Sequence, residues 1–138
     1  MPTPSFLNNI RYAIEKRLAD KWGSTTPVRY PNVVWKQPAT EFIDLGVAWG
    51  PSQQTSLGTT KREVQHGTVI VRVNVALGNG TKRAMELADA VQAVFRYQQL
   101  TKNTTVVNFY ESSIGAAVEG PTHFGLNVGF RFQAEDEF

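Results

Sequence analysis

The segment between Gly67 and Leu77 constrains the fold of this chain more than any other. In an extended conformation, one of its faces carries only apolar side chains: Val69, Val71, Val73, Val75 and Leu77. The opposite face is mixed: Thr68, Ile70, Arg72, Asn74 and Ala76. Since successive side chains alternate across a β-strand, this pattern predicts a strand with one buried face. Its length of about 11 residues is roughly twice that of a usual strand, so we expect it at the centre of a sheet.

Two segments repeat their apolar residues at helical spacing and predict amphipathic helices. The first has an apolar stripe made of Phe6, Ile10, Ala13, Ile14, Leu18 and Trp22. The second is expected from Lys82 to about Gln98, after a Gly78-Asn79-Gly80 turn. Its apolar face consists of Ala84, Leu87, Ala88, Val91, Val94 and Phe95. Each helix is therefore expected to cover a sheet with one face.

Further strands are predicted over residues 27–30, 41–50, 104–110, 112–119 and 123–133, with 98–103 as a polar connection. The fold class that follows is α+β: a mainly antiparallel twisted sheet with both helices on one face. We expect a single domain over 1–138 with an acidic tail over 134–138. The far face of the sheet would expose Gly125 and Gly129, where the backbone of a partner could approach closely.

A polar segment, 50–66, precedes the long strand and has few apolar residues. Gly50-Pro51 is expected to end the preceding strand. Structureless loops of this length are uncommon unless they are functional or disordered. The segment is therefore predicted to form a loop that extends a long β-hairpin arm beyond the body of the protein.

Composition and motifs argue against catalysis. The net charge is only +2, without runs of Lys or Arg, and cysteine is absent. His66 and His123 are the only histidines and lack the spacing of a metal site. The Walker and dinucleotide patterns both fail at the 78–83 turn. We expect no enzymatic activity, no metal and no cofactor. Without a signal peptide or an apolar run long enough to cross a bilayer, synthesis in the cytoplasm is expected.

Taken in order, these pieces resemble the tail terminator proteins of long, flexible-tailed (siphovirus) bacteriophages, the lambda-like tail terminators. The features that carry the resemblance are an N-terminal helix, Pro27-Val28-x-Tyr30-x-Asn32, Pro38, a strand that ends in Trp49, Gln53-Gln54-x-Ser56-Leu57-Gly58, Arg62 ahead of Gly67, and Gly78-x-Gly80 before the second helix. The resemblance covers nearly the whole chain, and none of these features is a catalytic signature.

The resemblance implies a structural protein of the virion, made in the cytoplasm of the host bacterium. Such subunits look like small α+β domains that form a six-membered ring at the head-proximal end of the tail tube. The ring would end polymerisation of the tube and provide the surface for head joining. Expected partners are further copies of this chain, the major tail tube protein and head–tail connector proteins, with non-specific contact to passing DNA.

Contact residues are expected mainly in the arm. Those expected to contact other subunits or the tube are Gln53, Gln54, Leu57, Arg62 and His66. Second choices, for an interface or the lumen, are Arg72, Asn74 and Arg131. Two alternatives stay open from the sequence: another phage connector or tail-tube component of similar size, and a monomeric binding module that uses the open sheet face.

Overall fold

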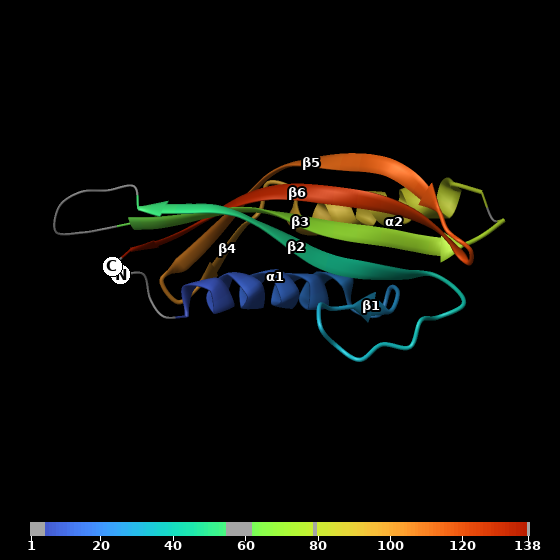
Figure 1. Ribbon diagram of the computed structural model, residues 1–138, viewed down its shortest axis with the longest axis horizontal. Helices are drawn as coiled ribbons and strands as arrows, with labels where there is room; N and C mark the ends of the chain where they lie inside the picture. The colour runs from blue at the N-terminus through green and yellow to red at the C-terminus, as the bar shows by residue number, and fades with distance from the viewer. Residues whose placement is uncertain (1–4, 55–61, 79, 138) are drawn as a thin grey trace.

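The computed structural model describes residues 5–54, 62–78 and 80–137. In this part of the chain, two helices and six strands form an elongated α+β structure (Figure 1). The elements are, in chain order, α1 (Phe6–Trp22), β1 (Val28–Arg29), β2 (Phe42–Gln54), β3 (Arg62–Ala76), α2 (Lys82–Phe95), β4 (Gln99–Lys102), β5 (Thr105–Glu119) and β6 (His123–Glu137). The predicted fold class is confirmed.

The strands form one sheet in the order β1-β2-β3-β6-β5-β4. Only β1 and β2 run parallel; the other neighbours are antiparallel. β3 lies in the interior of the sheet, where it pairs with β6 along its whole length and with β2 from Glu63 to Asn74. The central position predicted for the 67–77 segment is thereby confirmed, although β3 begins five residues earlier, at Arg62, and ends at Ala76.

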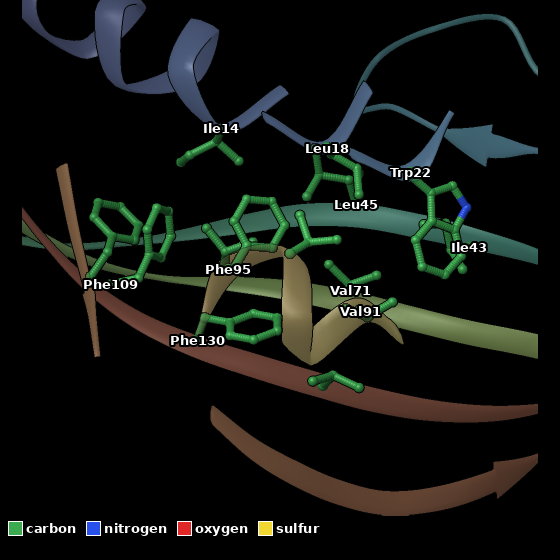
Figure 2. Close-up of a cluster of buried hydrophobic side chains, with 14 of the residues drawn as sticks. Ile14, Leu18, Trp22, Ile43, Leu45, Val71, Val91, Phe95, Phe109 and Phe130 are labelled. Atoms are coloured by element: carbon green, nitrogen blue, oxygen red, sulfur yellow. The ribbon is translucent and has the colours of Figure 1, made fainter. Parts of the chain in front are cut away.

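Both helices cover the valine face of β3. Val69, Val71 and Val73 are fully buried, in one cluster with residues of α1, α2 and β6. Figure 2 shows Ile14 of α1 and Phe95 of α2 among these side chains, with Phe130 beneath. The two helices also contact each other, because the Arg17 side chain donates a hydrogen bond from Nε to the Val94 carbonyl, at 2.8 Å. The opposite face of the sheet carries no helix of the described residues.

Two strands are longer than the sequence predicts. β2 does not end at Gly50-Pro51 but continues to Gln54, with a shift of register between Trp49 and Ser52. A proline is tolerated there because β2 is an edge strand at this point and the shift is typical of a bulge. β6 does not end at Gln133: the expected acidic tail continues the strand to Glu137.

Near the other margin of the sheet, the predicted boundaries also change. The polar connection over 98–103 contains β4, which forms a hairpin with β5. The two strands predicted over 104–110 and 112–119 are one strand, β5, interrupted by register shifts after Phe109 and after Ile114. α2 ends at Phe95, before the left-handed residue Tyr97, and not at Gln98.

Candidate functional site

The first candidate surface is the arm, where the ends of β2 and β3 project beyond the helices (Figure 1). Here Gln53 pairs with Val64 and Gln54 with Glu63. Residues 51–54 are all exposed, so both predicted glutamines lie on the surface. The predicted contact residue Leu57 lies outside the described residues. Residues 51–54 and 62–66 of the arm thus belong to paired strands and not to a loop.

The base of the arm is more firmly held than its polar sequence suggests. β6 pairs with this part of β3, placing Arg62 opposite Glu137 and Val64 opposite Glu135. Val64 is only 3% exposed. The predicted contact residue Arg62 already forms an ion pair within the subunit, with 3.5 Å between its Nε and the Glu135 carboxylate. It therefore has a structural partner as well as an exposed side chain.

Gln65 is a buried polar residue at this base that the sequence analysis missed. Its side-chain amide donates to the carbonyl oxygens of Gly50 and His66, at 2.9 and 2.8 Å. It therefore holds the bulged part of β2 against β3. His66 itself is half-buried opposite Gln133. Only knowledge of the β2–β3 register would have distinguished Gln65 from the exposed glutamines.

The second candidate surface is the open face of the sheet, which carries Arg72 and Asn74. Asn74 is buried, and its amide donates to the Asp44 carboxylate at 3.0 Å. It is thus a structural amide and not the exposed residue that a contact role requires. Arg72 is half-buried, and its Nε has no hydrogen-bond partner among the described residues.

The sequence predicts that a partner's backbone can approach the glycines of this face, but side chains of the same subunit occupy that space. A β-carbon at Gly125 would lie 2.6 Å from Nε of Arg72, so the arginine of the same subunit occupies that space. At Gly129 the nearest atom would be the Ser113 hydroxyl, at 3.3 Å. Arg131 lies further along the face, largely exposed, with its guanidinium 3.2 Å from the Glu111 carboxylate and over the Tyr110 ring.

A third surface is a groove of about 900 Å³ between α1, the 31–33 connection and β2. Large apolar side chains line it while staying exposed: Leu7 at 54%, Val33 at 57% and Trp49 at 46%. Exposed apolar side chains gathered in a groove are typical of an interaction site. The sequence analysis did not predict Leu7 as a surface contact, because the groove that it lines exists only once the 31–33 connection lies next to α1 and β2.

Little among the described residues points to a catalytic or metal-binding site. No group of three or more His, Asp or Glu side chains among them could hold a metal ion. The His123 ring lies 2.7 Å from the Thr40 carbonyl oxygen and edge-on to Phe42, which is a packing role at the start of β6. No described helix has the length and hydropathy needed to cross a membrane.

Among the comparisons with known proteins, a solved structure shares the fold and a family model gives the family. None of the curated proteins matches this chain. Among solved structures 13 chains match; one, whose name states no function, has a TM-score of 0.74 and 21% identity over 93% of this chain and 94% of its own. A family model described as phage tail terminator protein matches residues 9–132. This protein therefore belongs to the phage tail terminator family, whose members are structural components of the phage tail.

Proposed function

We propose that six copies of this protein form a closed ring that caps the head-proximal end of the tail tube. The ring ends polymerisation of the tube and provides the surface to which the head is joined. Family membership supports a role in the tail. The observation that supports the ring is the asymmetry of the sheet, whose two margins are formed by different strands: short β1 beside β2 at one margin and short β4 beside β5 at the other. Contacts between unlike surfaces are heterologous, and they give a ring when the rotation closes.

Termination follows from a subunit that fits the tube on one side only. One surface of the ring matches the last tube subunits, whereas the opposite surface offers no further site for them. The arm is our candidate for the tube-facing or neighbour-facing contact, because Gln53 and Gln54 are exposed and uncharged. The open sheet face would line the lumen, where Arg72 and Arg131 could meet the phosphates of passing DNA without reading its sequence.

The mass of the purified protein in solution tests the ring. A discrete species near six times the 15.3 kDa of one chain supports it. Long polymers would instead favour a tube component, which is the nearest alternative. A monomer at the highest accessible concentration, both alone and with isolated tail tubes, would contradict the proposal.

A phage that lacks this protein tests termination itself. We expect over-long tails, or tails without heads, in electron micrographs of the lysate. Supplying the protein in trans should restore tails of normal length joined to heads. Normal virions from the null mutant would rule out the proposed role, whatever the oligomeric state in solution.

A further inference from the structure

Both margins of the sheet are incomplete along part of their length. β1 covers β2 only at Ile43 and Asp44. On the other margin β4 covers 105–108 of β5, and two backbone hydrogen bonds from the 97–98 segment extend this to Tyr110. Within the described residues, no strand lies beside the remaining stretches. We call these stretches the β2 free edge (residues 45–50, up to Pro51) and the β5 free edge (residues 112–119).

The β5 free edge lacks lysine, proline and, among the described residues, a covering strand, although a register shift after Ile114 lies within it. Its sequence is Ser-Ser-Ile-Gly-Ala-Ala-Val-Glu, with no charge before the last residue and no proline. Ile114 and Val118 are 46% and 47% exposed. Proteins usually protect such an edge with Lys, Pro or a covering element, since it is a template for another strand. An exposed apolar edge without lysine or proline is therefore expected to have a strand partner.

The two free edges are displaced from each other along the strand direction and overlap only near residues 45–47 of β2. Through the strand register, Ile114 of β5 is level with Leu45 of β2, so the β5 free edge extends away from the arm from about there. The β2 free edge extends from Leu45 toward the arm. Their centres are displaced by about four residues, or about 13 Å at the usual rise per residue.

This displacement is what a curved, closed sheet needs. Four long strands separate one free edge from the other, which is about 19 Å at the usual spacing between strands. A displacement of about 13 Å over that width corresponds to a strand tilt of roughly 35°, close to the tilt found in closed barrels. Neighbours related by pure rotation would thus bring the two free edges side by side without any shift along the ring axis.

We propose that the partner at these edges is a second copy of the chain. The β5 free edge of one subunit pairs antiparallel with the β2 free edge of the next, so that the sheet continues around the ring. This inference rests on the proposed ring and names its contact. Strand addition supplies main-chain hydrogen bonds, while pockets beside the strand receive its side chains. The groove lined by Leu7, Val33 and Trp49 runs beside the β2 free edge and offers such a pocket.

Charge and shape agree with this pairing. Glu119 ends the β5 free edge, and Arg29 ends β1 next to the β2 free edge. Both side chains belong to exposed residues, and neither forms an ion pair among the described residues. Antiparallel pairing brings the Glu119 end of one subunit to the Arg29 end of the next. It also places β1 and β4 beyond the two ends of the new contact, where they do not obstruct it.

Proline substitutions test the pairing, because they remove an outward N–H without breaking the internal ladder. Ile43 donates its N–H outward to Pro27, so by alternation the N–H of Val47 points the same way. The Tyr110 carbonyl accepts on the other margin, so the N–H of Ile114 faces outward there. Val47→Pro and Ile114→Pro should therefore each abolish the ring and leave monomers. Val47→Ala and Ile114→Ala are matched controls that keep the N–H and should keep the ring.

Mixing the two proline variants is the decisive step. Each retains one intact edge, so together they should form a dimer of twice the mass of one chain, and nothing larger. Rings from either proline variant alone, while the wild type also forms rings, would overturn the edge pairing and leave the proposed ring standing. A wild type that never leaves the monomeric state would overturn both.

A cross-linking measurement covers the case in which a proline variant does not fold. The chain has no cysteine, so Ala48→Cys and Ala116→Cys can be introduced together. Within one subunit these positions lie on the two opposite margins, too far apart for a disulfide. Oxidation should therefore produce chains linked between copies, and Ala90→Cys with Ala116→Cys should not. Equal cross-linking of both pairs would overturn the inference.

Discussion

The Arg72 side chain lies over Gly125 of the adjacent strand β6, on the open face of the sheet. A β-carbon at position 125 would be 2.6 Å from the arginine Nε. A second glycine, Gly67, is crowded on the opposite face, where a β-carbon would lie 2.5 Å from the Phe132 ring and 2.9 Å from the Ala48 carbonyl oxygen. The two contacts differ in kind. A guanidinium at the end of a flexible chain can move into solvent, whereas a fully buried ring and a backbone carbonyl cannot.

The two glycines should consequently respond differently to alanine. Gly67→Ala overpacks the core beside Phe132, and we expect a loss of about 1–3 kcal/mol in the free energy of unfolding. Gly125→Ala should cost less, no more than about 1 kcal/mol, because only the Arg72 side chain has to move. Urea denaturation of both variants measures the difference. Equal losses would show that Arg72 is as firmly fixed as the core.

The ion pair between Glu41 and Arg83 predicts a pH dependence. Arg83 donates from Nε and Nη2 to the two carboxylate oxygens, at 2.8 and 2.7 Å, and joins the approach to β2 to the start of α2. The hydrogen bonds from Arg83 lower the pKa of Glu41 below its ordinary value. A lowered carboxylate pKa stabilises the folded state above the pKa of the unfolded chain, and this contribution is lost as pH falls through the folded-state pKa.

We therefore expect Glu41→Gln to be less stable than the wild type at pH 7, by up to about 1 kcal/mol, because the pair is partly exposed. The difference should shrink as both proteins are titrated below the ordinary glutamate pKa of about 4.3. Glu86→Gln is the matched control, since Glu86 lies 3.8 Å from the same arginine without the paired hydrogen bonds. A difference that persists unchanged in acid would contradict the assignment.

Sequence periodicity predicts those parts of the fold where one element faces one continuous core. The valines of β3 and the apolar stripe of α1 are examples, because their patterns depend only on local geometry. It does not predict β6 beyond Gln133. Asp136 there is only 1% exposed, and it accepts a hydrogen bond from the Thr104 hydroxyl at 2.5 Å. An acidic residue is buried in a strand only if such a partner exists, and that partner is distant in sequence.

The candidate surfaces follow the same division. The exposure of Gln53 and Gln54 follows from the polarity of their segment. The ion pair of Arg62 does not, since it requires β6 to reach the arm. The free edges are invisible in the sequence, because they depend on the order of strands in the sheet and on how short β1 and β4 are. A surface that depends on the order of strands in the sheet cannot be predicted from local sequence patterns, however clear those patterns are.

The base of the arm offers a further test, because its two kinds of glutamine should behave differently. Gln65→Ala leaves the carbonyl groups of Gly50 and His66 without their side-chain donor, so we expect a loss of about 1–2 kcal/mol in the free energy of unfolding. Gln53→Ala should change stability little, since Gln53 is exposed. In a phage complementation assay Gln53→Ala is instead expected to lower the yield of joined tails. Thermal unfolding with a yield assay separates the two effects; the reverse pattern would contradict both assignments.

Replacing the arm segment from Gln53 to Gly58 with a short Gly-Ser link extends this test. Gln53 and Gln54 are exposed, so the melting temperature should fall by only a few degrees, which corresponds to about 1 kcal/mol for a domain of this size. Ring or tail assembly should be impaired if the arm makes contacts there. A collapse of thermal stability would show that the arm belongs to the core.

The opposite charges of Arg29 and Glu119 allow the direction of the proposed contact between subunits to be tested. Arg29→Glu should place two carboxylates together at each contact, and Glu119→Arg should place two guanidinium groups together. We expect each single variant to weaken ring assembly about 5-fold, since a partly exposed ion pair contributes up to about 1 kcal/mol. The double variant restores opposite charges and should recover the wild-type assembly midpoint, measured by mass as a function of concentration. Added salt should reduce all these differences. If the double variant assembles no better than the worse of the singles, Arg29 and Glu119 of neighbouring subunits do not meet.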